Sequence, residues 1–371
     1  MKTSDRGYQV AVIGASSLLG KELMAVLRER KFPVSQLVRI ETKTEEPEIP
    51  ILDLDGSAGD LPIETDVHES DPDFAFLAGP PPDRDALPAF LREENARPVV
   101  IDLCGDAGTT HAKVIGESAG WSLEVPFLDR EFSVSGAPPG SKRIVSAHPA
   151  TIVLGAVLLR LSQRVLIERA VAQVFAPVSE IGTKAIDELQ KQTVNLLSFH
   201  KIPEAVFGGQ LAFNVLPRLG RSRRGNTQGF RDELTDVGGR VRSQLQMYLD
   251  GRVPIPALRL VQAPVFYSLA VSLYVETTDS VTPELLAQSL AGERVRVSRS
   301  SEQPPSQVRV TGSNDILVDA ITVEPAHANG AWIWATADNM RLAAVNAVEI
   351  AERASGSAIS TSHGAPSNIV T

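Results

Sequence analysis

The chain has 371 residues, of which 43% are hydrophobic and 22% charged, and its formal net charge is -9. This length allows two domains with separate cores. Nucleic acid and anionic membrane surfaces repel a net anion, so the composition argues against both as partners. The basic segment at residues 218–224 (RLGRSRR) is the one candidate nucleic-acid contact, although short basic runs are usually solvated loops.

The single cysteine, Cys104, excludes an internal disulfide and a thiolate metal site, which favours a reducing compartment. The amino-terminal segment lacks the apolar core of a signal peptide. The longest mostly apolar stretch, residues 147–161, is too short to span a bilayer. We therefore expect a cytoplasmic protein with no bound metal and no membrane partner.

The first half of the chain alternates strand-like and helix-like segments. Continuous apolar runs predict buried strands at residues 8–13, 38–40, 74–77 and 99–103. Apolar residues at helical spacing predict helices at residues 17–30 and 83–96. This alternation predicts an α/β fold with a Rossmann-like, doubly wound parallel sheet.

The pattern changes after a turn-rich linker at residues 135–143. It then predicts helices at residues 151–161 and 183–197, strands at 169–175, 258–276, 307–323 and 332–337, and a last helix at 339–353. This order predicts an α+β domain with an antiparallel or mixed sheet. We expect a dinucleotide-binding domain at residues 1–145, completed by a helix at 338–354, and a substrate and dimerisation domain at 146–337. Residues 355–371 are rich in Ser, Ala and Gly and are expected to form a disordered tail.

A glycine-containing turn follows the first predicted strand and opens the first helix. Backbone amides at a helix N-terminus can bind a pyrophosphate, and glycine allows its close approach. The middle glycine of the usual fingerprint is replaced by a serine, which could equally serve only as a helix cap. The candidate cofactor-binding residues here are Gly14, Ser16, Ser17, Leu18, Leu19 and Gly20, with Gly79 after a later strand.

Glu41 follows the turn at the end of the second predicted strand. An acidic side chain there can accept hydrogen bonds from the adenosine ribose and would repel a 2′-phosphate, which favours NAD over NADP. Arg39 and Lys43 lie close by in sequence and could contact a phosphate instead. All three residues could also be ordinary surface charges.

Four segments, in order along the chain, resemble the aspartate-semialdehyde dehydrogenase family. They are VAVIGASSLLGKEL at the turn, PVSEIGTKAIDELQKQT at residues 177–193, AFNVLP at 212–217 and WIWATADNMRLAAVNAVEIAE at 332–352. The last segment is similar to the family's Asp-Asn-(Leu/Met)-Arg motif and its C-terminal helix. The resemblance implies the two-domain fold, a homodimer, a nicotinamide cofactor (NAD or NADP), and Asn339 as part of the cofactor site.

The resemblance also implies a reaction that this chain is not equipped to perform. In the family, a cysteine thiolate at a helix start attacks the acyl group, and a histidine moves protons. The cysteine position falls on Pro149, and the histidine position falls on Leu269. A family arginine becomes Gln262, and the family's Glu-Glu-x-Lys segment has no clear counterpart in residues 225–246. We therefore expect no catalytic residue at the family positions.

Other residues could in principle replace the lost nucleophile. Ser146, His148 and Thr151 surround the proline, but an unassisted hydroxyl is a poor nucleophile without an oriented base. Cys104 follows a strand near the expected cofactor site, although most such cysteines behave as small apolar residues.

Three functions are compatible with these observations. The first is a NAD(P)-binding dimer that has lost dehydrogenase chemistry and serves in assembly or regulation with an unknown protein partner. The second is an active NAD(P)-dependent semialdehyde dehydrogenase with altered catalytic residues. The third is a conventional aspartate-semialdehyde dehydrogenase of amino-acid biosynthesis. The joint loss of cysteine and histidine favours the first.

Overall fold

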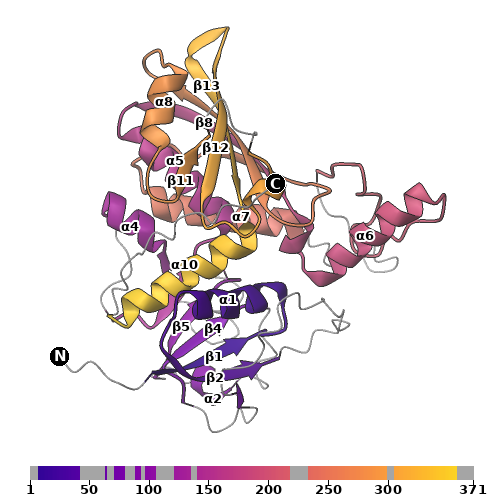
Figure 1. Cartoon of the computed structure of the whole chain (residues 1–371). Coiled ribbons are helices and arrows are strands. Elements are labelled where there is room, and N and C mark those ends of the chain that lie inside the picture. Colours follow the sequence, from indigo (N-terminus) through magenta and orange to yellow (C-terminus); the bar gives the residue numbers. More distant parts are fainter. Residues whose placement is uncertain are drawn as a thin grey trace, which may run out of the picture.

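The computed structural model contains two β-sheets, with the C-terminal helix α10 (Asn339–Ala354) lying between them (Figure 1). It describes residues 7–41, 63–64, 71–79, 88–92, 97–105, 121–134, 140–217, 233–298 and 305–356. The expected tail from residue 357, the basic segment at 218–224 and Lys43 lie outside the described residues.

The first sheet has the strand order β3-β2-β1-β4-β5-β7-β6, and every recorded strand pair in it is parallel. Two separate apolar clusters cover its faces, one formed with α1 and α10 and the other with α2. Helices on both faces confirm the predicted doubly wound architecture. The elements are β1 (Tyr8–Ile13), α1 (Leu18–Glu29), β2 (Val34–Ile40), β3 (Ile63–Glu64), β4 (Phe74–Leu77), α2 (Ala89–Arg92), β5 (Val99–Asp102), β6 (Ser122–Glu124), α4 (Pro126–Phe132) and β7 (Arg143–Ser146).

The second sheet has the order β11-β12-β13-β10-β8-β9 and mixes parallel and antiparallel pairs. One face packs against α5, whose thirteen buried residues run from Pro149 to Leu161. A helix that is apolar on all sides must lie inside a core. The elements are α5 (Pro149–Ser162), β8 (Ile167–Ala176), the 3-10 helix η2 (Val178–Glu180), α6 (Thr183–Leu197), α7 (Glu233–Leu249), β9 (Ala257–Gln262), β10 (Leu269–Thr277), α8 (Pro283–Leu290), β11 (Val295–Val297), α9 (Gln307–Val310), β12 (Ile316–Glu324) and β13 (His327–Ala337).

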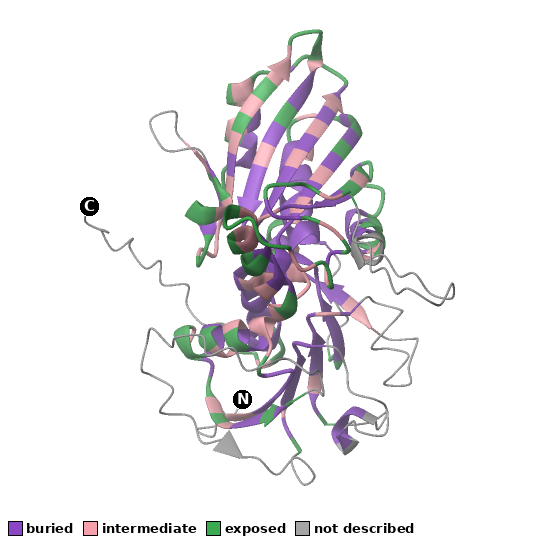
Figure 2. Cartoon of the chain, turned by 90° about the vertical axis from the view of Figure 1, so that its right-hand side faces the viewer, coloured by how far each residue is buried: buried purple, intermediate pink, exposed green. Residues whose placement is uncertain are grey.

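The opposite face of this sheet is partly exposed (Figure 2). Buried and less buried residues alternate along its strands, as expected when only one face is covered by the core. Aromatic side chains gather on the uncovered face, where Phe175 packs against Trp334 and Tyr274 against Trp332. Trp332 is 41% exposed and Val171 is 43% exposed. An apolar face of this kind is suited to a protein interface.

The predictions of a single long strand at residues 258–276 and at residues 307–323 are wrong. Residues 258–276 form two strands, β9 and β10, because Pro264 has no amide to donate and Ser268 adopts a φ of 70°. Residues 307–323 begin as the short helix α9, and Gly312, with a φ of 77°, turns the chain into β12. The helix predicted at residues 83–96 is described only at residues 88–92, where α2 has four residues.

Helix α10, near the C-terminus, packs on elements from the N-terminal part of the chain. It packs beside α1, and Arg341 forms ion pairs with Glu22 and Glu29 of that helix. The buried Asn346 donates to the Glu124 carbonyl at 3.1 Å and to Ser146 Oγ at 2.8 Å, which ties α10 to the last strands of the first sheet. The C-terminal helix thus packs on the N-terminal sheet.

Candidate functional site

The carboxyl edge of the first sheet gathers the candidate residues. Gly14, Gly79, Cys104 and His148 follow strands β1, β4, β5 and β7 in turn. Because these strands are parallel, their carboxyl ends lie at one edge, which is where open α/β sheets bind ligands. The glycine turn also lies at the point in the strand order where the connections reverse direction, between β1 and β4.

The glycine turn is shaped by close backbone packing. Gly14 has a φ of 78°, and a Cβ at this position would come within 2.8 Å of the Gly79 nitrogen. A Cβ at Gly20 would come within 2.2 Å of the Gly14 oxygen. Ser17 caps α1 by accepting the Gly20 amide at 2.9 Å, and it donates to the Ala78 carbonyl at 2.8 Å. The glycines are therefore required by the fold, whether or not a ligand binds.

The start of α1 nevertheless keeps the character of an anion site. Leu18 and Leu19 are the first helical residues, so their amides have no acceptor within the helix. They lie at the positive end of the helix dipole. The predicted residues Gly14, Ser16, Ser17, Leu18, Leu19, Gly20 and Gly79 are thus brought together around one turn.

Glu41 reaches the same turn and contacts it directly. Its Oε2 accepts the Ser16 amide at 3.1 Å and also the Ser16 hydroxyl. The structure therefore places this predicted residue beside the turn. Its carboxylate already accepts one backbone amide of the turn, that of Ser16. A second negative group at this point would meet its repulsion.

A second polar group surrounds the start of α5. Pro149 is the first residue of that helix, where its missing amide costs no hydrogen bond. His148 is the N-cap, and its Nδ1 accepts the Ala150 amide at 3.1 Å. An accepting Nδ1 carries no proton, so the proton of the neutral ring is on Nε2. Nε2 lies 2.6 Å from Glu180 Oε1 and donates to it.

Glu180 stands among donors from three other segments. Arg240 Nη2 lies 3.6 Å from Glu180 Oε1, and Arg240 Nη1 donates to the Cys104 carbonyl. The Asn339 side chain also stabilises the Glu180 carboxylate, and its Nδ2 donates to the neighbouring Ser179 Oγ at 3.2 Å. Asn339 is therefore placed in this second group, and its Oδ1 accepts the Ser268 amide at 3.0 Å. The link from Arg240 to Cys104 connects the second sheet's domain to the edge of the first sheet.

Burial and charge set the ionisation of this pair. Burial lowers the pKa of His148, and the nearby Arg240 lowers it further, against the opposing effect of Glu180. Burial of Glu180 alone would raise its pKa, but His148, Arg240 and Asn339 stabilise the carboxylate and hold its pKa below the ordinary value. The pair is thus a neutral imidazole donating to a carboxylate. This imidazole cannot take a proton on Nδ1 without breaking the cap of α5.

The two other residues that we expected at family positions have well-packed side chains. Leu269 is 1% exposed and belongs to the core of the second sheet. Gln262 is fully buried, and its Nε2 donates to the Ala176 carbonyl at 2.8 Å. Neither side chain can transfer a proton at neutral pH.

Cys104 is not prepared for nucleophilic attack. Burial raises the pKa of its thiol to about 12, and the nearby Asp102 adds to this effect. The reactive species of a cysteine is the thiolate, which is scarce at neutral pH when the pKa is so high. The structure gives no support to Cys104 as a relocated nucleophile.

Three important residues of this second group were missed by sequence reasoning. They are Glu180, Arg240 and Gln244. Gln244 Oε1 accepts the His148 amide at 2.8 Å and the Thr151 hydroxyl at 2.9 Å. Arg240 and Gln244 are four residues apart on α7, so helical periodicity could have placed them on one face. Glu180 offered no such signal, because its partners lie far away in the sequence.

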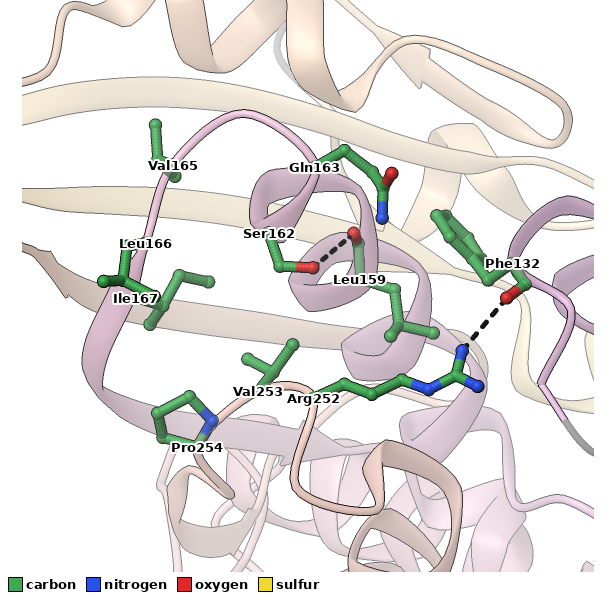
Figure 3. Close-up of a pocket in the computed structure, with 10 residues that line it drawn as sticks. All are labelled: Phe132, Leu159, Ser162, Gln163, Val165, Leu166, Ile167, Arg252, Val253 and Pro254. Atoms are coloured by element: carbon green, nitrogen blue, oxygen red, sulfur yellow. Dashed lines mark hydrogen bonds between the residues drawn. The ribbon is translucent and has the colours of Figure 1, made fainter.

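A cavity of about 260 Å³ lies elsewhere (Figure 3). It is lined mainly by apolar residues at the C-terminal end of α5 and the start of β8. Its one charged lining residue, Arg252, donates to the Phe132 carbonyl at 3.0 Å. Helix α5 has 14 residues and is therefore roughly 20 Å long, which separates this cavity from His148 at its other end.

Two kinds of site are absent from the part of the chain that the structure describes. No cluster of three or more His, Cys, Asp or Glu residues there could hold a metal ion. No helix within the same residues is long and apolar enough to cross a membrane.

We expect the buried His148 to make stability depend on pH. Its folded pKa is lowered, whereas the unfolded value is about 6.5. The contribution of the buried, neutral His148 to the free energy of unfolding is therefore fully present above about pH 6.5. It is lost as the pH falls below this value, by up to about 1.4 kcal/mol per pH unit. His148→Asn, which preserves an N-cap acceptor, should have a shallower loss of unfolding free energy between pH 7 and 5 in urea titrations. The exposed His200→Asn should keep the wild-type slope, and equal slopes in all three proteins would contradict this account.

Comparison with known proteins agrees with this architecture. The model of the family described as "Semialdehyde dehydrogenase, dimerisation domain" matches residues 158–342. Aspartate-semialdehyde dehydrogenase of Aquifex aeolicus is 27% identical over 93% of this chain and 97% of its own length. Aspartate-semialdehyde dehydrogenase 2 of Vibrio cholerae is 28% identical with the same coverage.

A solved structure extends the likeness to three dimensions. The crystal structure of aspartate-semialdehyde dehydrogenase II from Vibrio cholerae has a TM-score of 0.71 and 26% identity. The match covers 94% of this chain and 98% of that chain. With the matched dimerisation domain, the near full-length relatives and the shared fold, this chain belongs to the aspartate-semialdehyde dehydrogenase family.

Proposed function

We propose that the chain is a nicotinamide-dinucleotide-binding homodimer that lacks the family's phosphate-dependent aldehyde dehydrogenase activity. The observation that carries this proposal is the start of α5, where Pro149 replaces a nucleophile and His148 is bound on both ring nitrogens. A cytoplasmic role in assembly or regulation, with a protein partner, fits a binding protein without turnover.

The glycine turn fits a dinucleotide. Gly14 allows a close backbone approach at this turn, and the Leu18 and Leu19 amides are donors that would suit a pyrophosphate. Gly14, Ser16, Ser17, Leu18, Leu19, Gly20 and Gly79 would hold the cofactor, and Glu41 would meet the adenosine ribose. Asn339 would contribute from the start of α10, where Glu180 now engages it. When bound, the nicotinamide would offer hydride transfer.

In this proposal, the residues present supply neither the nucleophile nor the proton carrier that the family reaction needs beside hydride transfer. Family chemistry needs a thiolate for the covalent intermediate and a group to carry protons. Pro149, Leu269 and the protonated thiol of Cys104 offer neither. Losses within one catalytic unit are strongly non-additive, so the second loss costs little after the first.

The uncovered face of the second sheet supports self-association. Residues 146–337 would form the substrate and dimerisation domain, and residues 1–145, completed by 338–354, the cofactor domain. The aromatic pairs Phe175–Trp334 and Tyr274–Trp332 lie on the face opposite α5, which is partly exposed among the described residues. Stable interfaces bury about 1,600 Å² in total, which a six-stranded sheet face can provide.

The first expected result concerns turnover. Purified protein with aspartate semialdehyde, phosphate and NAD or NADP should show no oxidation above background, because no thiolate is available. The Cys104→Ser variant should give the same trace. Robust wild-type turnover would overturn the proposal, and turnover that disappears in Cys104→Ser would identify that thiol as a relocated nucleophile.

The second expected result concerns the cofactor. Calorimetry should detect weak binding with NAD preferred, because the Glu41 carboxylate repels a 2′-phosphate. Glu41→Ser should tighten NADP binding by about tenfold, equivalent to about 1.4 kcal/mol. The exposed Glu284→Gln on α8 is a charge-matched control and should leave both affinities unchanged. Absence of heat with either cofactor at millimolar concentration would count against dinucleotide binding.

The third expected result concerns assembly. Light scattering at micromolar concentration should give the mass of two chains. Trp332→Glu places a charge on the uncovered sheet face and should shift the protein towards the monomer, because burying an unpaired charge is costly. Val308→Glu on α9, where the wild-type side chain is 87% exposed, should remain dimeric. A wild-type monomer would refute the interface.

A further inference from the structure

The donors around Glu180 come from separate parts of the fold and converge on one carboxylate. They are His148 at the start of α5, Arg240 on α7 and Asn339 at the start of α10. The Glu180 side chain is 13% exposed, the Arg240 side chain is 17% exposed, and His148 is 4% exposed. Arg240 also has a buried Nε without a recorded partner. The site is thus rich in donors and nearly closed to water.

Each donor is held in place by bonds that do not involve Glu180. His148 is fixed through Nδ1 by the Ala150 amide and through its own backbone amide by Gln244. Arg240 Nη1 is fixed by the Cys104 carbonyl. Asn339 is fixed by the Ser268 amide and by Ser179. Donors that are preorganised in this way can bind an anion without reorganisation.

We propose that His148, Arg240 and Asn339 form a binding site for a small-molecule carboxylate, and that Glu180 is its internal ligand. In the wild-type chain, the Glu180 carboxylate fills the site and excludes external carboxylates. This inference deepens the proposed function, because an anionic substrate would have to displace a covalently tethered competitor. A purely structural ion pair would instead lose stability on mutation without gaining affinity for anions.

The surrounding backbone should survive removal of this side chain. The amides of Val178 and Ser179 donate to the Val265 and Phe266 carbonyls at 2.9 and 3.0 Å, and the Glu180 amide donates to the Pro177 carbonyl at 3.2 Å. The path of η2 is therefore fixed by main-chain bonds. Glu180→Ala and the more conservative Glu180→Ser should both leave the donors in place around an open cavity.

The test is a titration of full-length Glu180→Ala with sodium formate, followed by thermal unfolding and calorimetry at constant ionic strength. Formate should bind saturably and raise Tm by about 3–6 °C at 100 times its dissociation constant. The wild type should show no saturable response. The double variant Glu180→Ala/Arg240→Met retains the cavity but loses the cation, and it should lose most of the formate affinity.

Several outcomes would overturn the proposal. One is a formate response no larger than that to sodium chloride, and another is an equal response in the wild type. Retention of full formate affinity in the double variant would also overturn the proposal. If Glu180→Ala is insoluble, Glu180→Ser is titrated instead, and insolubility of both variants even with formate present throughout purification also counts against the proposal. Wild-type turnover of aspartate semialdehyde would overturn the proposed function and leave this measurement standing, so the two failures are distinguishable.

Discussion

The hydrogen bond from His148 Nε2 to Glu180 depends on which ring nitrogen carries the proton, and much of the site depends on that bond. Nδ1 is committed to the first turn of α5, so Nε2 can only donate. Glu180 then connects α5 with α7 and α10 through Arg240 and Asn339. Arg240 continues the link to the Cys104 carbonyl at the edge of the first sheet. This proton position thus contributes to the contacts among five segments from both halves of the chain.

The residues that we expected at family positions also have structural roles of their own. Pro149 suits the first position of a helix, where its fixed φ matches the helical value and no amide is needed. Leu269 contributes to the core, and Gln262 donates to a neighbouring carbonyl. Each replacement is accommodated by packing or hydrogen bonding.

Local patterns predicted the parts of the fold that depend on neighbouring residues. Strand β1, the glycine turn and α1 followed from an apolar run, two glycines and helical spacing. Helix α6 was predicted with the bounds that the structure shows, because its apolar residues recur at helical spacing. The break between β9 and β10 was missed. It depends on Pro264 and on the left-handed backbone conformation of Ser268, and Pro264 alone does not predict that conformation. Glu180 was missed because its role exists only after α5, α7 and α10 have met.

Glu41 and Glu180 each place a carboxylate of the chain against donors that could otherwise bind an anion. Glu41 accepts a donor of the glycine turn, and Glu180 accepts the donors at the start of α5. Backbone amides and cations that converge on an empty position leave buried donors unsatisfied, which costs stability. A carboxylate from the chain itself removes that cost without any ligand. At Glu180, the stability gained by filling the site is also a barrier to an external carboxylate, because the incoming group must replace bonds that are already made.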